Sequence, residues 1–360
     1  MKPTIEYLKK NPLFFLLIFL PLAFLAEVLG WGAVWVFAFS AIGVIPLAGL
    51  IGTSTEALAA YTGPKIGGLL NATLGNAAEL IITLVAIRAG LLELVKASIT
   101  GSILGNLLLV MGFSMLLGGT KNGKQKFDRT NASNQSILLT LAVLAMVIPS
   151  IFSHYIGEDT SIEVEAFNLG VAGLMIVLYA LGLFYSLRGK DSSPVTYPAA
   201  LEDVHHPSLK VWQAVVILGL ATLGVVILSE LLVGAVEVVV ANLGLSEFFL
   251  GIILIPIVGN VAEHLVAVQV AIKNQMDLSY EIAVSSSLQI ALFVAPLLVF
   301  ISLAMGNPLT LIFVPLELIA LGAAIFVANQ VANDGESNWL EGVSLIVVYL
   351  ILALAFFMIN

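Results

Sequence analysis

The sequence predicts an all-α membrane protein of eleven transmembrane helices, arranged as one N-terminal helix followed by two inverted repeats of five helices. Three observations support this fold class. Hydrophobic residues make up 60% of the 360 residues and charged residues only 10%, with a mean hydropathy of +1.08, whereas soluble domains usually carry about 25% charged residues. The chain divides into eleven long apolar runs, and a five-residue motif inside one of them recurs 184 residues later.

The composition also limits the chemistry. The chain contains no cysteine, which excludes disulfides, thiolate metal sites and cysteine nucleophiles, so any metal must bind to oxygen or histidine. The net charge is −9, but many acidic residues lie within or beside apolar runs, so their positions are more informative than their sum. We expect a lipid bilayer around the protein, no nucleic-acid partner and no cofactor, and the sequence leaves the oligomeric state open.

Each apolar run approaches or exceeds the length of a membrane span, because a hydrocarbon core of about 30 Å needs roughly 20 residues of helix. The first run follows Lys9 and Lys10 as in a signal peptide, but no small-residue cleavage site precedes the next run, so we expect a retained helix. The second and seventh runs are long enough to be tilted or broken, and Pro46 in the second removes a backbone hydrogen bond. The predicted spans are approximately residues 13–29, 31–61, 64–88, 95–118, 135–153, 165–187, 211–241, 246–272, 280–304, 308–329 and 340–359.

The distribution of positive residues predicts the orientation, since Lys and Arg accumulate on the cytoplasmic side of a membrane. With eleven spans, 12 of the 14 Lys and Arg fall on the side of the N-terminus, and only Arg88 and Lys96 fall on the other side. A missed or additional helix would reverse every later loop and remove this asymmetry. We therefore expect a multi-pass protein, in the cell membrane, with a cytoplasmic N-terminus and the C-terminus on the opposite side.

The recurring motif indicates an internal duplication. Gly75–Glu79 reads GNAAE and Gly259–Glu263 reads GNVAE, and the same shift of 184 residues superposes Ser102 on Ser286. The shift spans five helices, an odd number, so the two copies must cross the membrane in opposite directions. Inverted repeats are common in secondary transporters, which bind substrate near the midplane between the repeats. The predicted units are residues 1–30, a cytoplasmic segment with the extra helix; 31–187, the first repeat; 188–210, a polar cytoplasmic linker; and 211–360, the second repeat.

Glu79 and Glu263 are the strongest candidate site residues, because an unpaired carboxylate inside a span costs at least a few kcal/mol and needs a proton, an ion pair or a metal. Asn76 and Asn260 each precede one of these acids by three residues and share its helix face. Gly75 and Gly259 permit a kink or a close backbone approach that frees carbonyl oxygens for ligation. The alternative is a polar contact that only holds helices together.

The helix after each motif adds further polar groups, Ser102 and Asn106 in the first repeat and Ser286 and Gln289 in the second, spaced to face inward together. The serines could equally be small residues that let helices approach, but buried amides need partners. Four further acids lie in or near spans, of which the first three are candidates for an ion pathway and the last is a weaker candidate: Glu56, Glu230, Glu237 and Glu317. For His264, which points about 100° away from Glu263 on a helix, we expect a packing or hydrogen-bonding role.

Carboxylate, amide and carbonyl oxygens without thiolates suit a hard cation, and calcium accepts six to eight such ligands. Two glutamates balance one divalent charge, and when calcium leaves, protons can neutralise the same oxygens in the low-dielectric interior. Calcium and protons should therefore compete at Glu79 and Glu263, which is the chemistry of an exchanger.

Two long stretches resemble the signature repeats of the calcium/proton exchangers, within the calcium/cation antiporter superfamily. The first repeat is matched by TGPKIGGLLNATLGNAAELIITLVAI with KASITGSILGNLLLVMG, and the second by GNVAEHLVAVQVAIKNQMDLSYEIAVSSSLQIALFVAP. The resemblance covers nearly the whole chain and implies eleven spans, alternating access, and transport by Glu79 and Glu263. It also implies supporting ligation near Gly75, Gly259, Asn106 and Gln289. Ser285, where the family usually has Gly, departs from the pattern, as does a less acidic linker.

Three other classes of protein are alternatives. A sodium/calcium exchanger would build additional monovalent sites around the same glutamates, and the signature stretches favour protons over sodium. A cation channel could line its pore with carboxylates, but one symmetric pair of acids fits a gated central site better. An intramembrane metalloprotease would need an HExxH motif, which the sequence lacks. The sequence therefore predicts a calcium/proton exchanger and not an enzyme.

Overall fold

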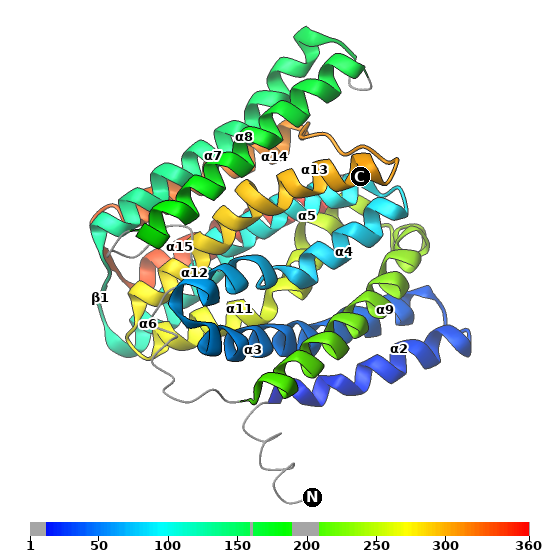
Figure 1. The fold of residues 1–360 in the computed structure, drawn as a ribbon, viewed down its shortest axis with the longest axis horizontal. Helices are drawn as coiled ribbons and strands as arrows, with labels where there is room; N and C mark the ends of the chain where they lie inside the picture. The colour runs from blue at the N-terminus through cyan, green and yellow to red at the C-terminus, as the bar shows by residue number, and fades with distance from the viewer. Residues whose placement is uncertain (1–11, 159–160, 189–208, 360) are drawn as a thin grey trace, which may run out of the picture.

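Helices account for nearly all of the chain in the computed structural model, which describes residues 12–158, 161–188 and 209–359 (Figure 1). The predicted linker at 188–210 lies almost entirely outside the described residues, as do residues 1–11. The two short strands, β1 Gln125–Lys126 and β2 Glu336–Ser337, pair antiparallel. The helices are η1 Pro12–Ile18, α2 Phe19–Val28, α3 Ala33–Leu74, α4 Ala77–Arg88, α5 Leu92–Leu104, η2 Gly105–Val110, α6 Met111–Asn122, α7 Arg129–Ile156, α8 Ile162–Arg188, α9 Val211–Leu243, α10 Glu247–Phe249, η4 Leu250–Leu254, α11 Ile255–Ile272, α12 Met276–Gln289, η5 Ile290–Val294, α13 Ala295–Ala304, α14 Pro315–Ala332 and α15 Trp339–Phe357.

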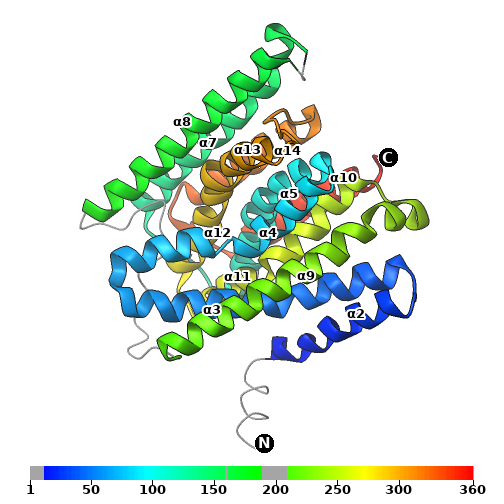
Figure 2. The same cartoon turned by 45° about the vertical axis from the view of Figure 1, so that its right-hand side comes forward.

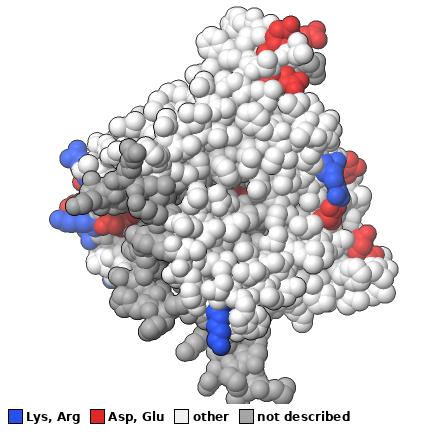
Figure 3. Space-filling view, viewed as in Figure 1, with Lys and Arg blue, Asp and Glu red and all other residues white. Residues whose placement is uncertain are grey.

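The predicted helical membrane fold is confirmed. Within the described residues, nine helical stretches are long and apolar enough to cross a membrane, and the shorter helix Leu13–Val28 is also apolar. The nine stretches coincide with nine of the eleven predicted runs; the other two runs are that shorter helix and the third run, whose helix is interrupted. Figure 3 shows a broad face almost free of charged residues, with Lys, Arg, Asp and Glu mainly at its edges. Outward-facing apolar side chains such as Leu174, 71% exposed, suit a hydrocarbon environment.

Helix α3 bends back on itself, although it is continuous as a helical element. A Cβ atom at Gly67 would lie 3.0 Å from the Cβ of Ala59, whereas eight residues of straight helix would separate the two positions by about 12 Å. The sequence predicts that this run is tilted or broken, and the structure shows no break at Pro46, through which the helix continues. The reversal falls where the sequence predicts the end of one span and the start of the next.

Close packing joins α3 to α9, which run side by side in both ribbon views (Figures 1 and 2). A Cβ at Gly43 of α3 would lie 2.8 Å from Leu228 of α9, and a Cβ at Gly224 of α9 would lie 2.8 Å from Leu47 of α3. Each leucine therefore fills the space above a glycine of the opposite helix. Small residues at such positions let membrane helices approach closely.

Three π-helical segments interrupt the spans that carry the predicted polar residues. The segment η2 separates α5 from α6, η5 separates α12 from α13, and η4 joins α10 to α11. A π-helical turn adds a residue to the regular ladder and is frequent at functional sites. The segments η2 and η5 occupy nearly equivalent places in the two predicted repeats, directly after the Ser102 and Ser286 turns.

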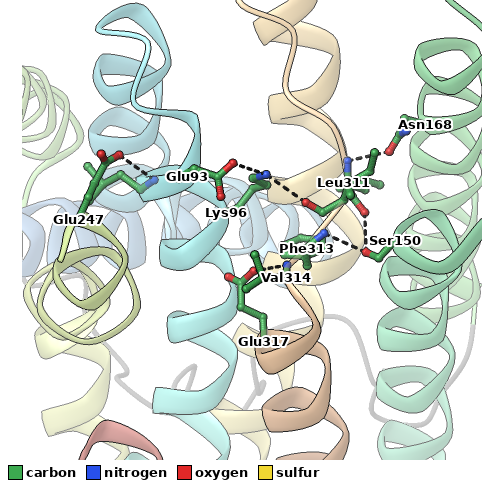
Figure 4. A network of polar contacts seen from close by, with 11 residues as sticks. Glu93, Lys96, Ser150, Asn168, Glu247, Leu311, Phe313, Val314 and Glu317 are labelled. Atoms are coloured by element: carbon green, nitrogen blue, oxygen red, sulfur yellow. Dashed lines mark hydrogen bonds and ion pairs between the residues drawn. The ribbon is translucent and has the colours of Figure 1, made fainter. Parts of the chain in front are cut away.

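An extended segment before α14 is tied to four helices through side chains, and we call these contacts the Lys96 clasp (Figure 4). Lys96 of α5 lies 2.6 Å from the Glu93 carboxylate and donates to the Ile312 carbonyl at 3.1 Å. Backbone groups of this segment are therefore satisfied by side chains in the absence of regular secondary structure. The other contacts are Leu311 N to Asn168 Oδ1 (2.7 Å), Ser150 Oγ to Leu311 O (3.2 Å), Phe313 N to Ser150 Oγ (2.9 Å) and Val314 N to Glu317 Oε2 (3.0 Å).

A related arrangement holds the connection before α7, and we call it the Asp277 clasp. The backbone N–H of Asp128 donates to the Asp277 carboxylate of α12, and Phe127 stacks on Tyr280 with ring centroids 5.0 Å apart. The shift of 184 residues relates Lys96 to Tyr280. In both clasps, a helix from one half of the chain holds a connection from the other half.

Candidate cation site

Glu79 lies just after an interruption of the helix. The helix α3 ends before Gly75, and Asn76 has the non-helical backbone angles φ −92° and ψ 18° before α4 begins. The Glu79 side chain is buried, and its Oε1 accepts hydrogen bonds from Ser102 Oγ of α5 and from Asn260 Nδ2 of α11. The carboxylate of the first half is thus bound by an amide from the second half.

Glu263 lies on the continuous helix α11 and is partly exposed. Its Oε2 accepts a hydrogen bond of 3.1 Å from Ser286 Oγ of α12, and Ser286 Oγ in turn accepts one of 3.1 Å from Asn106 Nδ2. His264 Nε2 lies 3.2 Å from Asn106 Oδ1, which confirms the hydrogen-bonding role expected for this histidine. The Ser–Glu pair recurs in both halves with the same separation of 23 residues.

The two motif glycines bring each carboxylate close to the other half of the chain. A Cβ at Gly259 would lie 2.9 Å from Glu79 Cγ, and a Cβ at Gly75 would lie 3.2 Å from Glu263 Oε1. The sequence allowed either a kink or a close approach at these positions. The structure has the interruption beside Gly75 only, whereas Gly259 lies within regular helix and both glycines provide the close approach.

The remaining predicted amides also meet at this place. Asn76 Nδ2 donates to Gln289 Oε1 at 2.7 Å, and both side chains are buried. Among the described residues, Glu79 Oε2 and Asn76 Oδ1 are buried oxygens without a hydrogen-bond donor. Buried polar atoms are rarely left unpaired, and oxygens that lack donors are the atoms a hard cation would bind.

This donor set limits how a cation could be held. No group of three or more His, Cys, Asp or Glu side chains able to hold a metal occurs in the part of the chain that the structure describes. A cation bound here would therefore need amide, hydroxyl or carbonyl oxygens in addition to any carboxylate. Such a ligand set suits calcium, which accepts mixed oxygen ligands in flexible geometry.

The other predicted acids have different surroundings. Glu230 Oε2 lies 2.6 Å from Arg88 Nη2, which ties α9 to the end of α4. Glu56 and Glu237 are exposed on α3 and α9, and Glu317 belongs to the Lys96 clasp. Arg88 was not singled out in the sequence as a partner, and only its position at the end of a span could have indicated one.

Comparison with known proteins places these features in a family. The model of the sodium/calcium exchanger protein family matches the chain twice, over residues 32–188 and 213–358. The Ca(2+)/H(+) antiporter of Aphanothece halophytica is 43% identical, with 97% of each chain covered. The Ca(2+)/H(+) antiporter ChaA of Bacillus subtilis is 41% identical over 97% of this chain and 100% of the relative. The structure of native YfkE is 39% identical, with a TM-score of 0.84, and the match covers 96% of this chain and 100% of that one. The chain therefore belongs to the sodium/calcium exchanger protein family and, within it, to the calcium/proton exchangers.

Proposed function

We propose that this chain exchanges calcium for protons across a membrane, with Glu79 and Glu263 alternately binding calcium and protons. The observation that carries the proposal is the pair of carboxylates, one from each half. Glu79 accepts hydrogen bonds from Ser102 and Asn260, and Glu263 accepts one from Ser286, in a site that also contains buried oxygens without donors. The relatives at 41–43% identity are named as Ca(2+)/H(+) antiporters, which agrees with this chemistry.

Charge balance gives the physical reason for exchange. Two ionised carboxylates in a low-dielectric interior are unfavourable unless their charge is compensated. One calcium ion compensates two negative charges, and protonation of both carboxylates does the same. The occupied states are therefore close to neutral, whereas the empty ionised state is costly. A transporter that changes its access only in compensated states would couple calcium movement to proton movement in the opposite direction.

The proposed architecture is eleven spans, with one N-terminal helix and two inverted repeats, and with the N-terminus in the cytoplasm. The double match to one family model and the related Ser–Glu pairs support the repeats. The reversal within α3 supports counting its two arms as parts of separate spans. In such a transporter the central site opens alternately to the two sides of the membrane.

Calcium flux into proteoliposomes, with proton and sodium gradients imposed separately, tests the proposal. We expect a proton gradient to drive uptake, and Glu79→Gln or Glu263→Gln to abolish it, because each variant keeps the side-chain shape but loses the ionisable oxygen. Glu163→Gln is the matched control, since this exposed glutamate lies at the start of α8 and makes no contact with the site residues. Undiminished flux in either site variant would contradict the assignment of Glu79 and Glu263.

The same assay separates the alternatives. A sodium gradient at constant pH should drive little calcium movement, and robust sodium-driven flux would favour a sodium/calcium exchanger. Flux that needs no counter-ion and does not saturate with calcium would favour a channel.

A further inference from the structure

A cavity of about 470 Å³ lies between α7 and α14, away from the carboxylate pair. Its lining contains one cation, several hydroxyl and amide groups, and no carboxylate. Two apolar residues of the lining, Ile137 and Leu141, are 56% and 47% exposed on α7, so the cavity is bordered by surface of the kind that faces lipid. The lining residues are Arg129, Ser133, Ser136, Ile137, Thr140, Leu141, Asn329, Gln330, Ala332 and Asn333.

The polar groups form a band along one face of α7. Arg129 is the first residue of the helix, and Ser133, Ser136 and Thr140 follow at spacings of three or four residues, which keeps them on the same face. The band extends about 16 Å from Arg129 to Thr140 at 1.5 Å per residue. At its deep end, Asn329 of α14 donates to Thr140 Oγ1 at 3.4 Å. The deeper hydroxyls also have partners within the protein, since Thr140 Oγ1 donates to Ser136 O at 2.8 Å and Ser136 Oγ lies 3.4 Å from Tyr280 Oη. Arg129 and Ser133 are exposed and are the polar groups open to an occupant.

Arg129 has a charge that the described part of the chain does not pair, since none of its ion pairs includes this residue. The neighbouring acids are directed elsewhere: Asp128 accepts from the backbone N–H groups of Thr130 and Asn131, and Asp334 accepts from that of Glu336. Neither acid lines the cavity. The cavity therefore combines a guanidinium without an ion pair among the described residues, hydroxyl and amide groups, and an apolar wall.

We propose that this cavity binds an anionic phospholipid, with the headgroup phosphate on Arg129 and an acyl chain along Ile137 and Leu141. A guanidinium pairs with phosphate through two parallel hydrogen bonds, and basic pockets between membrane helices are suited to anionic headgroups. The hydroxyls of Ser133 and Ser136 lie one and two turns deeper, at the level of the glycerol oxygens. A free phosphate ion would leave the apolar wall unused, and a second copy of this chain with two-fold symmetry would bring the same donors and the same positive charge. Lipid is therefore the occupant that uses both the guanidinium and the apolar wall.

The experiment is native mass spectrometry of the purified full chain from micelles containing equal amounts of phosphatidylglycerol and phosphatidylcholine. We expect one phosphatidylglycerol to remain bound to the wild type in preference to phosphatidylcholine. Arg129→Gln should weaken this binding about tenfold or more, as expected for loss of a charge-assisted hydrogen bond, and Arg129→Lys should retain part of it. Lys121→Gln is the matched control, because it removes an exposed positive charge at the nearby end of α6 without touching the cavity.

Two further measurements test whether a free anion or a second copy of the chain occupies the cavity instead. Inorganic phosphate at millimolar concentration should not displace the lipid, and displacement would show that the site recognises a free anion. Delipidated wild type and Arg129→Gln should have the same oligomeric state, and an association lost in Arg129→Gln would show that a second copy occupies the cavity. Equal retention of phosphatidylglycerol by the wild type and Arg129→Gln would overturn the proposal, and so would equal retention of the two lipids by the wild type. The melting temperature of every variant is measured as well, so that a folding defect is recognised independently of lipid binding.

Discussion

At the scale of single residues, the site depends on the motif glycines as well as on the carboxylates that follow them. Gly259 makes room for Glu79, and Gly75 makes room for Glu263. Each glycine is therefore required by the acid of the other half and not by the acid four residues after it. Duplication of the whole motif preserves both contacts at once.

Gly259→Ala should lower calcium affinity, because the added methyl group would lie 2.9 Å from Glu79 Cγ and displace the carboxylate or the helix. A misplacement of this size at a ligand set commonly costs tenfold or more. The calcium concentration for half-maximal flux measures the effect. Gly219→Ala in α9 is the matched control, since a Cβ there meets nothing within 4 Å; equal loss in both variants would show that the effect comes from helix flexibility instead of the contact.

The sequence predicted which residues form the site better than it predicted how those residues contact one another. Glu79, Glu263 and the amides of Asn76 and Asn260 were identifiable because polar groups in apolar runs need a reason. The hydrogen-bond partner of each side chain could not be predicted, because the bond from Asn260 to Glu79 joins residues 181 positions apart. Such a contact depends on how the two halves pack, and hydropathy and periodicity carry no information about that packing.

At the scale of elements, the sequence predicted where the long apolar helices lie better than how each helix is built. The apolar runs located the nine long helical stretches of the described residues, and the gap between the predicted spans 31–61 and 64–88 located the reversal that the structure has between Ala59 and Gly67. The π-helical segments η2 and η5 were not predictable, since the hydrophobic pattern of a single extra residue in a turn is the same as that of ordinary helix. The backbone contacts of residues 311–314 were also hidden, because they are made by side chains from four different helices.

Lys96→Met should destabilise the fold by about 1–3 kcal/mol, because it removes the donor to Ile312 O and leaves the buried Glu317 without a nearby positive charge. The melting temperature in detergent measures this loss. Lys124→Met is the matched control: its pair with Glu336 is on the surface, with the lysine side chain 73% exposed, and such pairs contribute about 0–1 kcal/mol. Adding Glu317→Gln to Lys96→Met should restore part of the stability, and purely additive losses would argue against coupling within the clasp.

At the scale of the whole molecule, the two halves are joined by exchange of contacts as well as by packing. The first half supplies Asn106 to Ser286, and the second half supplies Asn260 to Glu79. The clasps repeat this relation at the connections before α7 and α14. A movement of one half relative to the other would therefore alter the hydrogen bond from Asn260 to Glu79 directly and the bond to Glu263 through Ser286, which is what coupling of access to occupancy requires.

The proposed orientation can be tested directly, because the chain has no native cysteine. A single Lys121→Cys should react with a membrane-impermeant maleimide only from the cytoplasmic side, and a single Glu163→Cys only from the opposite side. Intact cells and inside-out vesicles give the two sides of the comparison. Both cysteines reacting from one side would mean that the chain does not cross the membrane an odd number of times between them, and the eleven-span topology would be wrong.

The last prediction follows from the proposal that calcium and protons bind to the same carboxylate oxygens. If calcium binds only when Glu79 and Glu263 are ionised, each step to lower pH converts calcium-competent protein into protonated protein, so the apparent calcium affinity must fall as the medium is acidified. Linkage makes the relation reciprocal: calcium binding must release protons, with the same coupling free energy.

Calorimetric titration of calcium in buffers of different ionisation enthalpy measures the protons released for each ion bound. We expect release in the pH range where exchange is active, and no calcium-linked release in Glu79→Gln/Glu263→Gln, with Glu163→Gln behaving as the wild type. Calcium binding without proton release in that range would place the two cargoes at separate sites. Coupling would then have to act through a change of conformation, and competition for one pair of carboxylates could no longer explain the exchange.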